Sequence, residues 1–220
     1  MRTEPFLTPD NMDEKTQGWI EDIGRLARPR PDLVVERSRC ALLVVDMLRY
    51  FAHPEGRVYL PSTAAVIPRI SVILEDWRRW GGTVVFTRHC HTGPDDLGML
   101  GRFFSDYIRC GERDSEIIEE LSPKAGEPVL RKTTYDSFCG TDLEEYLRDR
   151  GTEQVVITGV LTQMCCETTA RSAFVRGFEV YVPADALTTS SEELHLGSLR
   201  SMATSCAVIT SVDAICGGLA

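Results

Sequence analysis

Three residues suited to nucleophilic chemistry stand at or just beyond the ends of predicted strands: Asp46, Lys132 and Cys165. The carboxyl ends of parallel strands share one edge of an open sheet, so side chains far apart in sequence are expected to converge there. Cys165 also falls in the first turn of a predicted helix. The positive end of the helix dipole is expected to lower the pKa of its thiol and favour the thiolate. This pattern predicts that Cys165 is a nucleophile.

The chemistry of these three residues would be coherent. Asp46 would take the proton of the Cys165 thiol and later donate it to a leaving amine. Lys132 would keep Asp46 ionised and offset negative charge that develops on the substrate oxygen. The backbone N–H groups of Thr162 and Cys165 would form an oxyanion hole, because a first helical turn leaves its donors unpaired. The alternative is a structural ion pair beside a small core thiol.

The elements that must position these residues alternate along the chain. Near-continuous apolar runs such as CALLVV at 40–45 are typical of parallel strands that are buried on both faces. Five further strands are expected at 83–87, 128–131, 154–158, 178–182 and 206–210. Helices are expected at 63–80, 113–121, 142–151, 164–176 and 192–203. This order predicts a three-layer α-β-α, doubly wound, Rossmann-type fold with a mostly parallel six-stranded sheet.

The chain is expected to divide into an N-terminal arm and helix at 1–35 and one α/β domain at 36–220. Asn11 or Asp13 could cap a helix that runs to about Ala27, and two prolines follow it. This helix would pack either on a neighbouring subunit or as a lid on its own domain. The sequence does not choose between the two.

Composition restricts the partners. A net charge of -9 argues against nucleic acid, because phosphate binding needs clustered Lys and Arg. No apolar run resembles a signal peptide or a membrane span, so a cytoplasmic protein with a small-molecule substrate is expected. Its eight Cys are then expected to be reduced thiols, with no zinc-like spacing. Six of them are read as packing residues: Cys40, Cys90, Cys110, Cys139, Cys206 and Cys216.

Five segments of the chain resemble the isochorismatase-like cysteine hydrolases, a superfamily that includes nicotinamidases and N-carbamoylsarcosine amidohydrolase. They span about 40 to 210 in the family's order. The most specific is the one that carries the family's Gly-Val-x-Thr-x-x-Cys pattern. The segments are ALLVVDMLRYF at 41–51, VVFTRHCH at 84–91, RKTTYDSFCGTDLEEYLRDRG at 131–151, VVITGVLTQMCCETTARSAFVRGFEVYVPADAL at 155–187, and EELHLGSLRSMATSCAVIT at 192–210.

The resemblance implies an isochorismatase-like fold and places the family's catalytic Asp, Lys and Cys on Asp46, Lys132 and Cys165. It also implies a homodimer or homotetramer. The family has a non-proline cis peptide just before the Thr of its pattern, which implies a cis bond at Leu161–Thr162. The neighbouring Cys166 points about 100° away from Cys165 on a helix and is expected to be a core residue.

Two departures from the family bear on the pocket. Leu48 stands where Gln is common, and the loop FAHPEGRVY lacks the Asp-x-His metal motif of nicotinamidases. His89 and His91 would share one strand face and could form a metal site with His53. Such residues more often line a pocket, so neither a metal nor a cofactor is expected.

The substrate pocket is expected to be lined from the loops that follow the strands. Exposed arginines are usually solvated, so no substrate-carboxylate anchor is predicted among Arg49, Arg88 and Arg102. The expected lining is Phe51, His89, Tyr135, Phe138 and Leu161, with Thr162 and Gln163 beside them.

A cysteine at position 165 favours attack on an acyl carbon, because the true isochorismatases resemble this chain but have Gly at that position and cleave a vinyl ether without a thiol. The function expected is that of a metal-independent cysteine amidohydrolase, which cleaves the C–N bond of a small amide, ureido or carbamoyl compound through a covalent acyl-enzyme. Two alternatives stay open: an isochorismatase-type vinyl-ether hydrolase, and a non-catalytic thiol sensor or binding protein.

Overall fold

The computed structural model describes residues 5–217, and its centre is a sheet in which every pairing of strands is parallel. The strand order is β3-β2-β1-β4-β5-β7, and a short β6 pairs with β4. The bounds are β1 Cys40–Val45, β2 Thr83–His89, β3 Val129–Lys132, β4 Gln154–Val160, β5 Glu179–Pro183, β6 Leu187–Thr188 and β7 Val208–Thr210. The fold predicted from sequence is confirmed, with the two-residue β6 as a seventh strand.

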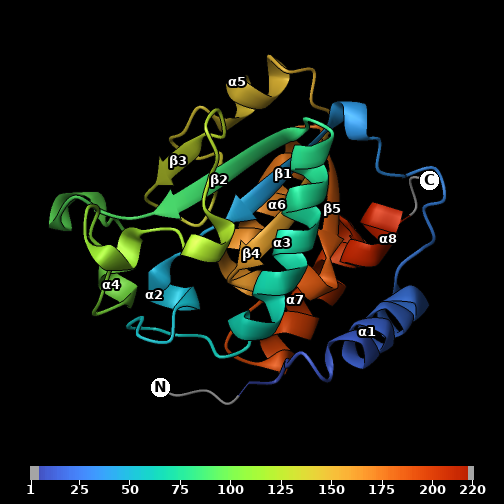
Figure 1. Ribbon diagram of the computed structural model, residues 1–220, viewed down its shortest axis with the longest axis horizontal. Helices are drawn as coiled ribbons and strands as arrows, with labels where there is room; N and C mark the ends of the chain where they lie inside the picture. The colour runs from blue at the N-terminus through green and yellow to red at the C-terminus, as the bar shows by residue number, and fades with distance from the viewer. Residues whose placement is uncertain (1–4, 218–220) are drawn as a thin grey trace.

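Helices cover both faces of this sheet, and Figure 1 shows α3 in front of it and α6 behind it. The α3 helix buries a stripe of residues at spacings of three and four, which is the period of an amphipathic helix. That stripe runs through Val66, Ile70, Ile73 and Trp77. The bounds are α1 Met12–Leu26, α2 Arg49–Ala52, α3 Thr63–Arg79, α4 Leu100–Phe103, α5 Leu143–Arg148, α6 Glu167–Val175, α7 Glu192–Ser205 and α8 Val212–Gly217.

The helix expected at 113–121 is wrong. The segment forms two short 3-10 turns, Arg113–Ser115 and Glu119–Leu121. Backbone groups of this segment form hydrogen bonds outside it. The Arg49 N–H donates to the Glu116 carbonyl, and the Ile118 N–H donates to the Met47 carbonyl. These bonds hold the segment against the chain that follows β1, and an α-helix would require the same groups for itself.

The N-terminal helix α1 packs on its own domain. Trp19 and Ile23 are buried in the same hydrophobic core as the central strands. The Trp19 indole N–H donates to Glu192 of α7 at 3.0 Å, and Lys15 forms an ion pair with the same carboxylate. Within this chain, α1 therefore packs on its own domain, as the second of the two expected arrangements has it.

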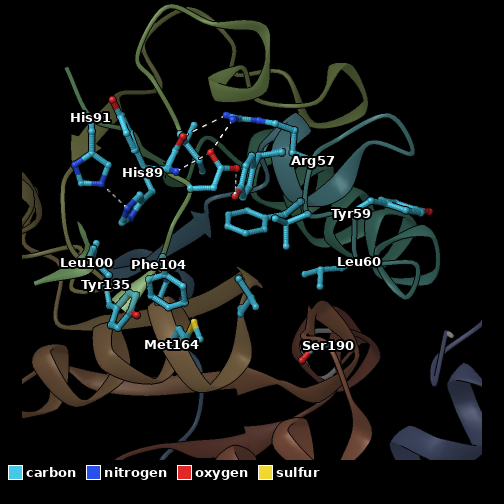
Figure 2. Close-up of a pocket in the computed structure, with 18 residues that line it drawn as sticks. Arg57, Tyr59, Leu60, His89, His91, Leu100, Phe104, Tyr135, Met164 and Ser190 are labelled. Atoms are coloured by element: carbon cyan, nitrogen blue, oxygen red, sulfur yellow. Dashed lines mark hydrogen bonds and ion pairs between the residues drawn. The ribbon is translucent and has the colours of Figure 1, made fainter. Parts of the chain in front are cut away.

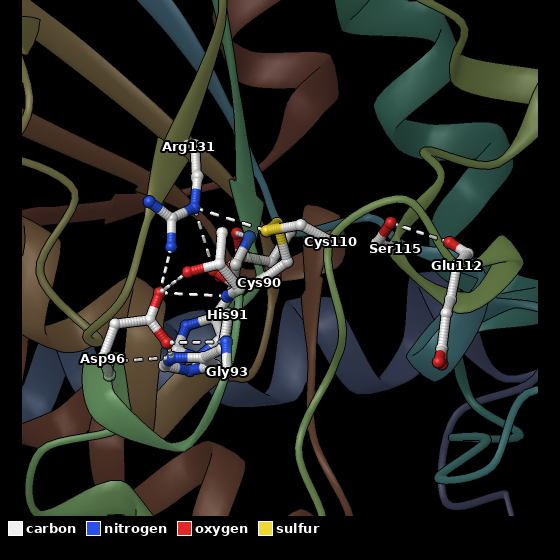
Figure 3. The surroundings of a disulfide bond; sticks show 11 residues. Cys90, His91, Gly93, Asp96, Cys110, Glu112, Ser115 and Arg131 are labelled. Atoms are coloured by element: carbon white, nitrogen blue, oxygen red, sulfur yellow. Dashed lines mark hydrogen bonds and ion pairs between the residues drawn. A yellow bond between two sulfur atoms is a disulfide. The ribbon is translucent and has the colours of Figure 1, made fainter.

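A disulfide joins Cys90 and Cys110, which corrects the expectation that all the cysteines are reduced (Figure 3). The His91 N–H donates to Ile108, and the Cys110 N–H donates back to the His91 carbonyl, so the two segments run side by side. That pairing brings the two Cα atoms to 5.0 Å. Spacing in the sequence does not reveal it, because it depends on a loop folding back on β2. The other six cysteines are free.

Within residues 5–217, none of the helices combines the length and the apolar character that a membrane span requires.

Candidate active site

The structure brings Asp46, Lys132 and Cys165 together at the carboxyl ends of the central strands. Asp46 follows β1, Lys132 ends β3, and Cys165 lies in the turn between β4 and α6. The Lys132 Nζ is 2.7 Å from Asp46 Oδ2 and 3.3 Å from Cys165 Sγ. The reactive atoms of Asp46 and Cys165 lie within 4.8 Å of each other. All three side chains are buried.

The chain turns sharply at Asp46, which has a φ of +50°. A positive φ is uncommon for a residue with a side chain, and such residues gather at functional sites. The adjacent strand accommodates the turn with a glycine. A Cβ at Gly159 would lie only 2.0 Å from the Val45 carbonyl oxygen, so only glycine fits beside the end of β1.

The two oxygens of the Asp46 carboxylate differ in their partners. Oδ1 accepts hydrogen bonds from Thr87 Oγ1 at 2.7 Å and from the His89 backbone N–H at 3.1 Å. Oδ2 pairs with the Lys132 ammonium at 2.7 Å, and no second hydrogen bond to it is present among the described residues. This oxygen therefore has a lone pair available for another donor.

Burial and the charge of the partner shift the pKa values of Asp46 and Lys132 in opposite directions. Burial alone would raise the pKa of Asp46, but the Lys132 ammonium overrides it and holds the pKa below the ordinary value. Burial likewise opposes the charge of Lys132, and Asp46 and Cys165 nevertheless raise its pKa above the ordinary value. Both groups are therefore charged at neutral pH.

The expected lowering of the Cys165 pKa is wrong. Burial raises the pKa of this thiol to about 12, with a further contribution from Asp46, and Lys132 offsets only part of the rise. The turn that carries the thiol, Thr162–Cys166, is a π-helix, and α6 begins only at Glu167. Desolvation of a buried thiolate outweighs the helix-terminus effect here. The resting thiol is protonated and needs a base.

The non-proline cis peptide lies at Val160–Leu161, one residue earlier than the resemblance implied. Val160 is the last residue of β4 and pairs with Thr188 of β6, so the cis bond lies at the end of the strand. The π-helical turn follows, and the Leu161 carbonyl accepts the N–H groups of Met164 and Cys166.

Sequence reasoning missed His195, which supports this turn from α7. Its Nδ1 is 2.9 Å from Thr162 Oγ1, and its ring is completely buried. Burial lowers the pKa of His195 to about 3, so the ring is neutral. Trp19 of α1 packs on it at 4.7 Å between ring centroids. The only sequence signal was a histidine within the apolar pattern of the last long helix.

A pocket of about 330 Å³ opens beside Cys165 and is mostly apolar (Figure 2). Four of the five substrate-contact residues expected from sequence line it: Phe51, His89, Tyr135 and Leu161. Phe138 is not among them, since it is buried and its ring stacks on Phe178 at 5.9 Å between centroids. His91, which was expected from sequence to line a pocket with His89, is also part of the lining. Residues that sequence reasoning missed complete it: Tyr50, Arg57, Val58, Tyr59, Leu60, Leu100, Phe104, Asp106, Tyr107, Ile108, Met164 and Ser190.

His89 and His91 share one face of the pocket, with their Nε2 atoms 3.0 Å apart. Burial and the Lys132 charge lower the pKa of His89 to about 4, so its ring is neutral. The Nδ1 atom of His89 is 3.4 Å from Lys132 Nζ and faces this donor. Figure 2 shows the two imidazoles side by side.

One group of described residues could supply three metal ligands: Asp46, His89 and Cys165. The Lys132 ammonium already lies within 3.4 Å of a donor atom from each of them. It occupies the position that a cation would need, so the donor set is satisfied by the lysine charge. His53 does not join this group, and its Nδ1 accepts the Glu55 backbone N–H at 3.2 Å.

The chain is similar to known proteins over most of its length. Residues 40–214 match the model of the isochorismatase domain. Nicotinamidase 3 of Arabidopsis thaliana is 38% identical over 176 residues, which are 79% of this chain and 85% of that protein. A protein named isochorismatase from Bacillus subtilis is 30% identical over 217 residues, 96% of this chain, but this chain spans only 64% of its length.

Among solved structures, a cysteine hydrolase from Pseudomonas syringae pv. phaseolicola superposes with a TM-score of 0.81 at 27% identity. The superposition covers 87% of this chain and 95% of that one.

Proposed function

The chain belongs to the isochorismatase family of hydrolases, and on this premise we propose that it is a cysteine amidohydrolase. It would cleave the C–N bond of a small amide, ureido or carbamoyl compound through a covalent acyl-enzyme. The single observation that carries the proposal is the position of the Lys132 ammonium, between the Asp46 carboxylate and the Cys165 thiol in a buried site. The similarity to a nicotinamidase and to a cysteine hydrolase supports it.

Acylation begins with Asp46, whose Oδ2 has a free lone pair close to the thiol. Because the pKa of Cys165 is raised to about 12, the thiol loses its proton only as the sulfur attacks the carbonyl carbon. A C–S bond forms, and the carbonyl electrons move to oxygen. Asp46 then passes the proton to the nitrogen, the C–N bond breaks, and ammonia or an amine leaves.

Hydrolysis of the thioester uses the same residues in the reverse direction. Asp46, ionised again after the amine has left, takes a proton from the attacking water. The C–S bond breaks, and the proton returns to the sulfur, so a carboxylic acid and the resting thiol result. Lys132 keeps Asp46 charged between the two half-reactions, since it is fixed 2.7 Å away and excluded from solvent.

The oxyanion would lie against the π-helical turn. The N–H groups of Met164 and Cys166 are bonded to the Leu161 carbonyl, and those of Thr162 and Cys165 are the proposed donors to the oxyanion. His195 holds the Thr162 side chain from behind, and Ser198 Oγ donates to the Thr162 carbonyl at 3.3 Å. The turn is therefore fixed before substrate arrives, which electrostatic stabilisation of a transition state requires.

Cleavage of a vinyl ether is the second candidate, and the similarity over almost the whole chain to a protein named isochorismatase favours it. That reaction needs no thiol nucleophile. The two candidates therefore differ in whether Cys165 forms a bond with the substrate, and a non-catalytic thiol sensor would hydrolyse neither substrate.

The test is an ammonia-release screen across small amides and ureido compounds, with intact-mass analysis after brief exposure to substrate. We expect ammonia release and an acyl adduct in the native protein. Cys165→Ala should abolish both, and Cys166→Ala should retain both if the fold survives, because Cys166 is a fully buried core residue. Turnover that persists in the Cys165→Ala protein would refute the mechanism.

Two properties expected from sequence stay as proposals: a cytoplasmic location, and assembly as a homodimer or homotetramer. Light scattering coupled to size-exclusion chromatography tests the second, and a monomer over the whole concentration range would contradict it.

A further inference from the structure

Charge is scarce on the walls of the pocket. Among the described residues that line it, Arg57 and Asp106 are the only Arg, Lys, Asp or Glu side chains. The neighbouring His89 ring is neutral at pH 7, because burial and Lys132 lower its pKa to about 4. Most other lining residues are aromatic or aliphatic. Arg57 is therefore the one pocket arginine that could pair with a negatively charged substrate.

Each of the three nitrogens of Arg57 already has a partner within the protein. Its Nε donates to Asp114 at 2.6 Å, its Nη1 donates to Asp106 at 2.7 Å, and its Nη2 donates to the Tyr107 carbonyl at 3.2 Å. The Glu112 carboxylate lies 3.9 Å away as well, and it is shared with Arg109 at 3.7 Å. The positive charge is thus surrounded by carboxylates of the protein itself.

Both oxygens of the Asp106 carboxylate also have partners within the protein. Its second oxygen accepts the Tyr50 hydroxyl at 3.0 Å, and the Arg57 guanidinium lies over the Tyr50 ring at 5.2 Å. We call these residues, Tyr50, Arg57, Asp106 and Asp114, the arginine clasp. It joins the wall formed by residues 50–60 to the wall formed by residues 100–108. In Figure 2, Arg57 lies across the pocket from Met164, with its bonds directed toward neighbouring side chains.

We propose that the arginine clasp makes this pocket selective for amides with an uncharged, apolar acyl group and excludes those that bear a carboxylate. The inference rests on the proposed amidohydrolase function. A substrate carboxylate would meet an Arg57 charge that Asp106 and Asp114 already offset, so it would lose its hydration for little gain in pairing. The carboxylates of the clasp would also repel it. The clasp thus acts as a repulsive element against anions as well as a support for the walls.

A matched pair of ligands tests this directly: hexanamide, and 6-amino-6-oxohexanoate, which replaces its terminal methyl with a carboxylate. Binding is measured by calorimetry to the Cys165→Ala protein, which requires no turnover, and kcat/KM is measured with the native protein. We expect hexanamide to be favoured by at least about 100-fold in both measurements. Equal or tighter binding of the carboxylate, or no binding of hexanamide, would overturn the inference.

Releasing Arg57 should reduce the discrimination. In Asp106→Asn/Asp114→Asn the guanidinium loses both close carboxylates, so the preference for hexanamide should fall by at least about tenfold. Asp114→Asn alone changes a residue outside the pocket lining and serves if the double variant does not fold. Arg113→Gln is the matched control, since this arginine is exposed and pairs with Glu55 at 3.6 Å outside the pocket. An unchanged preference in a folded clasp variant would refute the proposal.

Failure of the two proposals can be told apart. A protein that binds hexanamide selectively but forms no acyl adduct and releases no ammonia refutes the amidohydrolase function and supports the selectivity of the pocket. A protein that cleaves 6-amino-6-oxohexanoate faster than hexanamide supports the function and refutes the selectivity.

Discussion

The Lys132 ammonium lies 2.7 Å from the Asp46 carboxylate, and neither side chain reaches solvent. Each charge is tolerable in the interior only because the other is present. The pair is thus tied to the stability of the protein and to the proposed chemistry at the same time, and variants of the two residues can separate these contributions.

Removing one partner should destabilise the fold strongly. Lys132→Met leaves the Asp46 charge buried and unpaired, so the free energy of unfolding should fall by about 3–5 kcal/mol. Asp46→Asn should likewise be costly. The double variant Asp46→Asn/Lys132→Met should recover most of that loss and still release no ammonia. Urea denaturation measures the cycle, and a double variant no more stable than the worse single one would contradict it.

Stability should decline in mild acid because the buried His195 and the partly buried His89 are neutral in the folded state. The pKa is lowered to about 4 for His89 and to about 3 for His195. The unfolded chain takes up protons below about pH 6.5 while the folded protein does not, so the contribution is complete above that pH and is lost progressively as pH falls toward 3. The pKa of Asp46 is also lowered, so this carboxylate reduces the free energy of unfolding further only at pH values below the ordinary pKa of an aspartate.

Urea denaturation at a series of pH values should therefore show the free energy of unfolding decreasing by more than about 2 kcal/mol between pH 7 and pH 4. His195→Gln keeps a polar group next to Thr162 and removes one titrating ring, so its slope in this range should be shallower. Identical slopes for the two proteins would contradict the assignment of the slope to His195.

The fold could be predicted from sequence because apolar runs such as CALLVV at 40–45 are typical of strands buried on both faces and alternate with helical patterns. The meeting of Asp46, Lys132 and Cys165 then follows from topology, since β3, β1 and β4 all end at the same edge. Properties that depend on packing could not be predicted. The pKa of Cys165 depends on burial, which overrides the local helix-terminus effect.

The residues that line the pocket also could not all be predicted from sequence. Phe138 follows a predicted strand as Tyr135 does, but its ring turns toward Phe178 and away from the cavity. Arg57 and Asp106 are 49 residues apart, and no periodicity links them. The Cys90–Cys110 disulfide could not be predicted for the same reason, since a loop must fold back onto β2 before the two thiols meet.

The Cys165 thiol should react slowly with iodoacetamide at pH 7, because only its thiolate is a good nucleophile and its pKa is raised to about 12. The exposed Cys139 should be alkylated first and serves as the internal reference. Brief exposure to a cleavable amide should nevertheless acylate Cys165, since Asp46 removes the proton during attack. Peptide mapping by mass spectrometry measures the two rates. Fast alkylation of Cys165 in the resting protein would contradict a protonated thiol.

Loss of the Cys90–Cys110 disulfide should loosen one wall of the pocket. The crosslink closes the segment that carries His91, Leu100, Phe104, Asp106, Tyr107 and Ile108, all of which line the cavity. Cys90→Ala/Cys110→Ala should lower the free energy of unfolding by about 3 kcal/mol through the entropy of a loop of this length. It should raise KM several-fold, because the wall must be ordered when substrate binds.

The value of kcat should change little in this variant, since Asp46, Lys132 and Cys165 lie outside the crosslinked segment. Cys139→Ala, which removes an exposed free thiol, is the matched control and should alter neither constant. Treatment of the native protein with dithiothreitol should reproduce the rise in KM, and reoxidation should reverse it. A fall in kcat with an unchanged KM would place the role of the disulfide in the chemical step and contradict its assignment to the pocket wall.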